Sequence, residues 1–140
     1  IAAGARSVHG ENGAGAEFVC GTITLSPRRG VIDLTHDEFF VFRTKRAGVR
    51  IPYDKVNLLE YGQQVSRRYA MAVIISPLLL LSKSRKHFLT VGYTDEEGRQ
   101  QAIVLQVEKS QIRPVLVGLE AKTGLKVQYQ DPEARKAGKG

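Results

Sequence analysis

The feature that most constrains the fold is a two-residue alternation of apolar side chains in residues 88–93 and again in residues 102–107. Successive side chains of a β-strand point to opposite faces of the sheet, so each run presents one apolar face. Residues 95–98, between the runs, are polar and end in glycine, as is typical of a hairpin loop. The pattern predicts an antiparallel hairpin with a buried face.

An amphipathic helix is predicted directly after this hairpin. Pro114 is tolerated only in the first turn of a helix, so the helix should begin near residue 110 or 111. Gly124 provides a C-terminal stop, and Lys122 is well placed for the helix dipole. Four apolar residues fall at the spacing of one helical face: Ile112, Val115, Leu116 and Leu119.

Short apolar runs separated by turn residues predict further strands along the chain. An amphipathic helix must bury its apolar stripe, and a sheet face is the available partner. We therefore expect a mostly β fold, a barrel or strongly bent antiparallel sheet with one C-terminal amphipathic α-helix. The expected additional strands are residues 20–25, 31–34, 39–43, 49–51, 56–61 and 125–129.

The 140 residues fit one domain. Residues 1–16 are rich in Gly and Ala, and we expect a flexible N-terminal arm there. Residues 17–130 form the expected domain, and residues 131–140 an expected disordered basic tail. The small apolar residues 1–5 are typical of the end of a cleaved signal peptide, and we therefore expect an exported or membrane-peripheral protein.

The net charge of +7 favours a negatively charged partner: nucleic acid, anionic lipid or an acidic protein. Nucleic acid is disfavoured, because the sequence has no helix-turn-helix, zinc-finger or aromatic-plus-basic strand pattern. It also has no Trp.

Residues with potential catalytic chemistry do not form a recognisable pattern. Cys20 is the only cysteine, which excludes an internal disulfide and a cysteine metal cluster, and its apolar surroundings suggest a buried side chain. His36, Asp37 and Glu38 are adjacent, so on a strand they would not all converge on one site; they fit a polar turn better. His9 and His87 have no metal-ligand spacing. We expect no enzyme activity, metal or cofactor.

Taken together, residues 30–34, 49–56 and 119–127 resemble small barrels of the pleckstrin-homology-like and GRAM-like type, including uncharacterised bacterial proteins. The resemblance covers roughly residues 17–130. It implies a bent antiparallel sheet closed by a C-terminal helix. Proteins of this shape bind phosphoinositides, other acidic lipids or peptides, and the resemblance transfers no catalytic residue.

Residues 70–81 are the most apolar stretch, and basic residues bracket them on both sides. The stretch is too short to span a bilayer as a helix. It fits either a buried core segment or a loop that dips into one leaflet. The expected lipid-binding residues are Arg67, Arg68, Leu78, Leu79, Leu80, Leu81, Lys83, Arg85 and Lys86.

A second basic group surrounds one predicted turn: Arg43, Lys45, Arg46 and Arg50. It fits either a phosphate-binding loop or a solvated hairpin tip. The function we expect is non-catalytic binding to an anionic membrane surface. The alternative is a protein-interaction module without a lipid ligand, and the sequence leaves the oligomeric state open.

Overall fold

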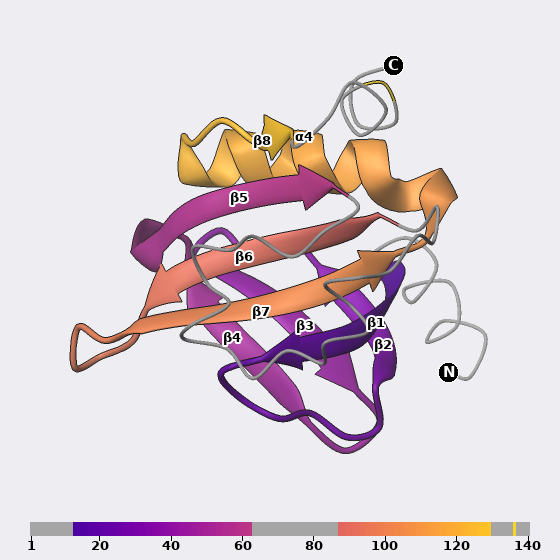
Figure 1. Ribbon diagram of the computed structural model, residues 1–140, viewed down its shortest axis with the longest axis horizontal. Coiled ribbons are helices and arrows are strands. Elements are labelled where there is room, and N and C mark those ends of the chain that lie inside the picture. Colours follow the sequence, from indigo (N-terminus) through magenta and orange to yellow (C-terminus); the bar gives the residue numbers. More distant parts are fainter. Residues whose placement is uncertain (1–12, 63–86, 130–135, 137–140) are drawn as a thin grey trace.

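In the part of the chain that the structure describes, eight strands form a single sheet and one α-helix packs against it (Figure 1). The computed structural model of the chain describes residues 13–62, 87–129 and 136. The strands are β1 (Ala14–Gly21), β2 (Arg29–Asp33), β3 (Phe39–Thr44), β4 (Gly48–Pro52), β5 (Val56–Gly62), β6 (Phe88–Thr94), β7 (Gln100–Val107) and β8 (Gln128–Tyr129). The helices are the 3-10 turns η1 (Tyr53–Lys55) and η2 (Lys109–Gln111) and the α-helix α4 (Ile112–Thr123).

Two antiparallel meanders build the sheet, in the strand order β4-β3-β2-β1-β7-β6-β5-β8. Strand β1 pairs with β2 on one side and with β7 on the other, and so joins the meanders. Within the described residues β4 and β8 do not pair, so the sheet is rolled but not closed. Among the described strands, only β8 runs parallel to its neighbour, β5. The fold class predicted from the sequence is confirmed.

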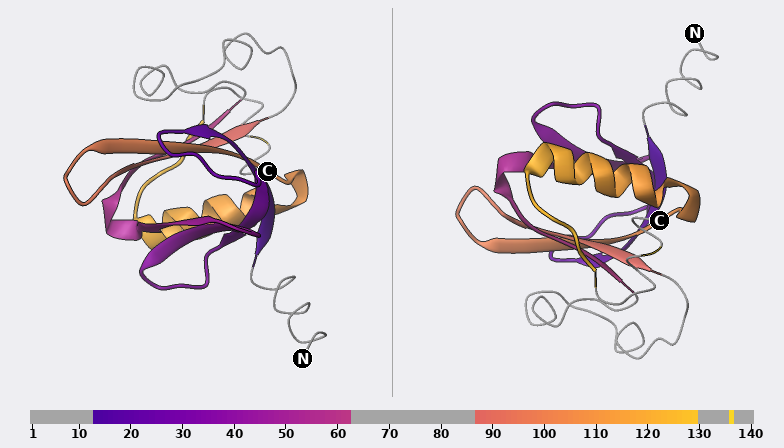
Figure 2. Two further views of the ribbon diagram at one scale, coloured as in Figure 1. Left: turned by 90° about the horizontal axis from the view of Figure 1, so that it is seen from below. Right: turned by 90° about the horizontal axis from the view of Figure 1, so that it is seen from above.

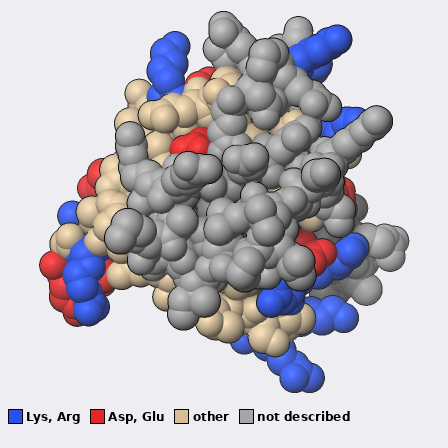
Figure 3. Space-filling model, in the orientation of Figure 1, with Lys and Arg blue, Asp and Glu red and all other residues tan. Residues whose placement is uncertain are grey.

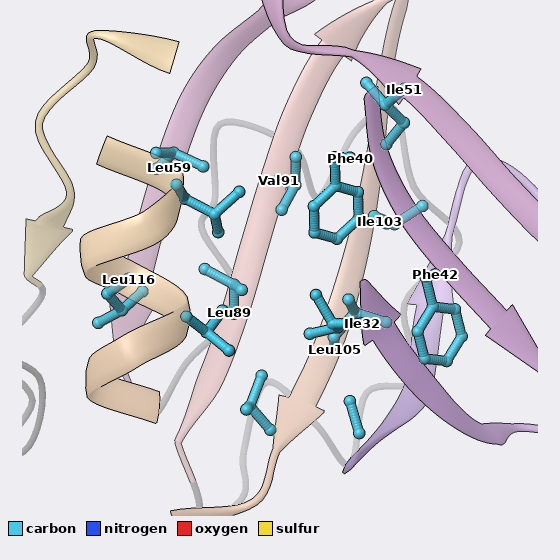
Figure 4. Close-up of a cluster of buried hydrophobic side chains, with 14 of the residues drawn as sticks. Ile32, Phe40, Phe42, Ile51, Leu59, Leu89, Val91, Ile103, Leu105 and Leu116 are labelled. Carbon is cyan, nitrogen blue, oxygen red and sulfur yellow. The ribbon is translucent and has the colours of Figure 1, made fainter. Parts of the chain in front are cut away.

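The core lies between the two meanders and the helix. Figure 4 shows Phe40 and Phe42 of β3 facing Ile103 and Leu105 of β7 across this space. Figure 2 shows α4 lying between the β2–β4 half and the β5–β7 half of the rolled sheet. The apolar stripe of the helix is buried throughout, as its spacing predicts. Gly124 ends the helix with a φ of 75°, a left-handed conformation that glycine adopts without strain.

A second apolar cluster forms on the opposite face of the sheet, from Cys20, Leu58, Phe88, Ala102 and Val104. Strand β6 is therefore buried on both faces. A bulge between Phe18 and Cys20 contributes to this arrangement, because the extra residue changes the face to which the following side chains point. Cys20 is buried and free, and burial raises the pKa of its thiol although the charge of Arg28 opposes this.

The first strand is where the sequence prediction was wrong. Strand β1 begins at Ala14, so residues 14–16 belong to the sheet and not to an arm, and it ends at Gly21 rather than near residue 25. Its first residues, Ala14-Gly15-Ala16, have low intrinsic strand preference. Pairing with β2 and β7 on both sides overrides that preference.

Truncating Leu116, in the buried stripe of α4, should destabilise the fold strongly. Leu116 is 1% exposed and Val117, beside it, is 63% exposed. We expect Leu116→Ala to lower the free energy of unfolding by about 2–5 kcal/mol, because the cavity adds to the lost burial. Val117→Ala should change it by no more than about 0.5 kcal/mol. Urea denaturation measures both, and equal losses would contradict this packing.

Candidate functional site: a basic cleft at one end of the sheet

A cleft of about 1040 Å³ opens at the end of the sheet where β5 and β7 end and β1 begins. This end lies on the right in Figure 1, where α4 also begins. Its volume suits a small ligand or the head group of a larger one. The cationic residues that line it are Arg29, Arg43, Lys45, Lys109, Arg113 and Lys136, and the anionic ones are Glu17 and Glu108.

The sheet register explains why residues distant in sequence meet in this cleft. Glu17 of β1 lies opposite Arg29 of β2 and Gln106 of β7. Val31 of β2 in turn lies opposite Arg43 of β3. Side chains at paired positions of adjacent strands share one face. Polar residues of β1, β2, β3 and β7 therefore lie on the same wall of the cleft.

Arg43 is held in place by a buried carboxylate. Its Nη1 lies 2.6 Å from Oδ2 of Asp33, which is 5% exposed. The backbone N–H and the hydroxyl of Thr35 donate to Oδ1 at 2.8 and 2.6 Å. Burial alone would raise the pKa of Asp33, but the hydrogen bonds from Thr35 and Arg43 lower it to about 2. Asp33 therefore fixes both the turn after β2 and the guanidinium of Arg43.

Three cations of the cleft have no anionic partner among the described residues. Arg29, Lys45 and Lys109 are exposed and form no ion pair within that part of the chain. The β6–β7 loop differs, because there Arg99 pairs with Asp95 and Glu97. In Figure 3 red and blue side chains lie together at the far left, whereas blue side chains gather at the lower right. Unpaired cations in a cleft favour an anionic ligand.

An aromatic pair also lines the cleft. The rings of Tyr61 and His87 are stacked with their centroids 5.4 Å apart. The Nε2 atom of His87 is buried and has no hydrogen-bond partner within the described residues. Burial, together with the nearby Tyr129, raises the pKa of Tyr61 to about 12. The pair gives the cleft a partly apolar wall with an unsatisfied polar atom in it.

Glu108 is placed beside β1 by a glycine. Its backbone N–H donates to the carbonyl oxygen of Gly15 at 3.0 Å. A side-chain carbon at Gly15 would collide with the carboxylate of Glu108. The missing side chain thus leaves room for this carboxylate against the strand.

The predicted basic loop is brought only partly into the cleft. Arg43 and Lys45 line it, whereas Arg46 and Arg50 do not. The guanidinium carbon of Arg50 instead lies 5.2 Å from the centre of the Phe39 ring, a cation–π contact on the outer part of the sheet. Arg50 lies opposite Val41 in the β3–β4 register, so it shares a face with Arg43 but lies further along the sheet from the cleft.

The predicted lipid-binding residues lie outside the described residues, as does the apolar stretch 70–81 itself. These are Arg67, Arg68, Leu78, Leu79, Leu80, Leu81, Lys83, Arg85 and Lys86. Sequence reasoning missed Arg29, Lys109, Arg113, Lys136, Glu17 and Glu108 as site residues. None of them belongs to a recognisable binding motif in the sequence, and only the folded structure reveals that they share a cleft.

The residues with potential catalytic chemistry remain apart in the described structure. His36 Nε2 is 3.8 Å from Asp33 Oδ2, but Asp37 accepts a hydrogen bond from Lys122 of α4. The described residues contain no group of three or more His, Cys, Asp or Glu side chains that could hold a metal ion. Among the same residues, no helix is long and apolar enough to cross a bilayer.

Comparison with models of known protein families found no match, and neither did comparison with curated proteins.

Because of the buried carboxylate of Asp33, the free energy of unfolding should fall as the pH drops below about 4. The folded pKa of Asp33, about 2, lies below the value of about 3.9 for an unfolded aspartate. Its contribution is therefore present above pH 4 and is lost as the pH falls towards 2. We expect this to remove about 2 kcal/mol of unfolding free energy.

Urea denaturation of the Asp33→Asn variant tests this expectation. The variant should be less stable at pH 7 and should lose less stability between pH 4 and 2 than the native chain. Asp54→Asn, at an exposed aspartate of η1, is the control and should keep the native pH profile. A native pH profile in Asp33→Asn would show that another group carries the acid sensitivity.

Proposed function

We propose that this chain is a non-catalytic binding domain that associates with anionic, phosphate-bearing membrane surfaces through the basic cleft. The observation that carries the proposal is the excess of cations in one cleft, where six Lys and Arg residues stand against two carboxylates. Arg and Lys side chains are effective donors to phosphate oxygens.

The energies involved suit reversible membrane binding. Each Lys or Arg near an anionic surface contributes about 1 kcal/mol, and salt screens this attraction over about 10 Å at 0.1 M. Several cations acting together would hold the domain at low salt and release it at high salt. The apolar stretch at residues 70–81 is a second proposed contact, because two weak signals together give stable attachment.

The fold supports the proposal at a general level. Two meanders joined through one strand, with a C-terminal helix packed between them, resemble the arrangement expected of a pleckstrin-homology-like or GRAM-like domain. We propose this relationship on the arrangement alone. A fold does not determine a ligand, so the functional argument rests on the cleft.

Reversing charges in the cleft should weaken membrane binding strongly. The test uses two double variants. The cleft variant combines Lys45→Glu with Lys109→Glu. The control combines Lys55→Glu with Lys126→Glu, which changes the net charge equally at exposed residues outside the cleft. We expect the cleft variant to bind phosphatidylglycerol-containing vesicles at least about tenfold more weakly, and the control to bind nearly as the native chain. Co-sedimentation at low and moderate salt measures both.

The outcomes separate the alternatives. Equal loss in both double variants would show that net charge, and not the cleft, attracts the vesicle. If the native chain ignores vesicles at every salt concentration, the membrane proposal fails. A mass of the domain in solution that rises with its own concentration, or when another protein is added, would then support the protein-interaction alternative.

A further inference from the structure

The cleft holds two carboxylates that a purely phosphate-binding site does not need. Glu17 and Glu108 line it together with the six cations, and neither forms an ion pair within the described residues. Glu17 lies opposite Arg29 in the β1–β2 register, yet the two side chains are not paired there. Charges of both signs therefore face the cleft without neutralising each other.

We propose that the ligand is a phosphate ester that also carries a primary ammonium group, as in ethanolamine phosphate. This inference rests on the proposed function and narrows it to a class of head group. The unpaired cations Arg29, Lys45 and Lys109 would bind the phosphate, and Glu108 would accept hydrogen bonds from the ammonium. Both are charge-assisted hydrogen bonds, the stronger class in proteins.

Glu108 is the better placed of the two carboxylates for this role. The backbone hydrogen bond to Gly15 anchors its main chain, and the bare backbone of Gly15 makes room for its carboxylate at the cleft wall. Its sequence neighbour Lys109 lines the same cleft, at the start of η2. An acceptor and a cation are thus adjacent in the sequence and line the same cleft, as suits a ligand with nearby charges of opposite sign.

Propyl phosphate, a phosphate ester without an ammonium group, is the comparison ligand. At neutral pH propyl phosphate has nearly the length of ethanolamine phosphate but a methyl group in place of the ammonium, and so carries more net negative charge. If only the excess of cations mattered, the cleft would prefer propyl phosphate. The two carboxylates would repel such a ligand, whereas they attract the ammonium.

The test is titration of the full chain with ethanolamine phosphate and with propyl phosphate, by calorimetry or by amide chemical shifts. We expect ethanolamine phosphate to bind at least about fivefold more tightly. Glu108→Gln should reverse this order, weakening ethanolamine phosphate and strengthening propyl phosphate. Glu96→Gln, in the exposed β6–β7 loop, is the matched control and should keep the native preference.

Two results would overturn the inference. One is a native chain that binds propyl phosphate equally or better. The other is a Glu108→Gln variant in which both ligands change by the same factor, since that would show only a general charge effect. A circular dichroism spectrum and melting temperature equal to those of the native chain would exclude misfolding of the variant as the cause.

Vesicles distinguish a lipid head group from a soluble phosphoamine. One set contains phosphatidylglycerol with phosphatidylethanolamine, and the other replaces the latter with phosphatidylcholine, whose ammonium has no N–H to donate. Preference for the first set supports the lipid source. Equal binding to both sets, with no soluble preference, overturns the inference and leaves the proposed function standing. Soluble preference without vesicle binding keeps the inference and removes the membrane proposal.

Discussion

Strand β1 is the constraint on which the rest of the structure depends. It pairs with β2 along one edge and with β7 along the other, so the two meanders form one sheet only through it. The bulge at Phe18 and Cys20 lets it serve both the inner core and the outer apolar cluster. The helix, the core and the cleft all take their positions from this junction.

The parts of the fold with strong periodicity were predictable from the sequence. The β6–β7 hairpin and α4 were expected at nearly the observed residues, because alternation and the helical stripe are local signals. Strand β1 was misplaced, because its Ala14-Gly15-Ala16 start has no local strand signal and is held by partners on both sides. The parallel pairing of β8 with β5 depends on tertiary packing and has no sequence signature.

The candidate site was predictable only where cations cluster in the sequence. Arg43 and Lys45 were identified because they surround one turn, but Arg29, Lys109 and Glu108 stand in short charged pairs that match no binding motif. Their proximity is a property of the register, which places Glu17 of β1 opposite Gln106 of β7, with Glu108 following shortly after. Sequence patterns predict which face a side chain occupies within one strand. They do not predict which strands become neighbours, and this site depends on the order and register of the strands.

The cleft joins the beginning of the described chain to its end. Its walls combine residues 15–17 with residues 106–109, about ninety positions apart, and include residue 136. No such arrangement exists in the unfolded chain, where these segments are separate. A ligand that occupies the cleft therefore binds the native state alone, and its binding free energy adds to the stability of the whole domain. Long-range contacts of this kind also slow folding, since the loop between them must close first. A cell that supplies the ligand would thus contain more of the folded protein, and occupancy and abundance would rise together.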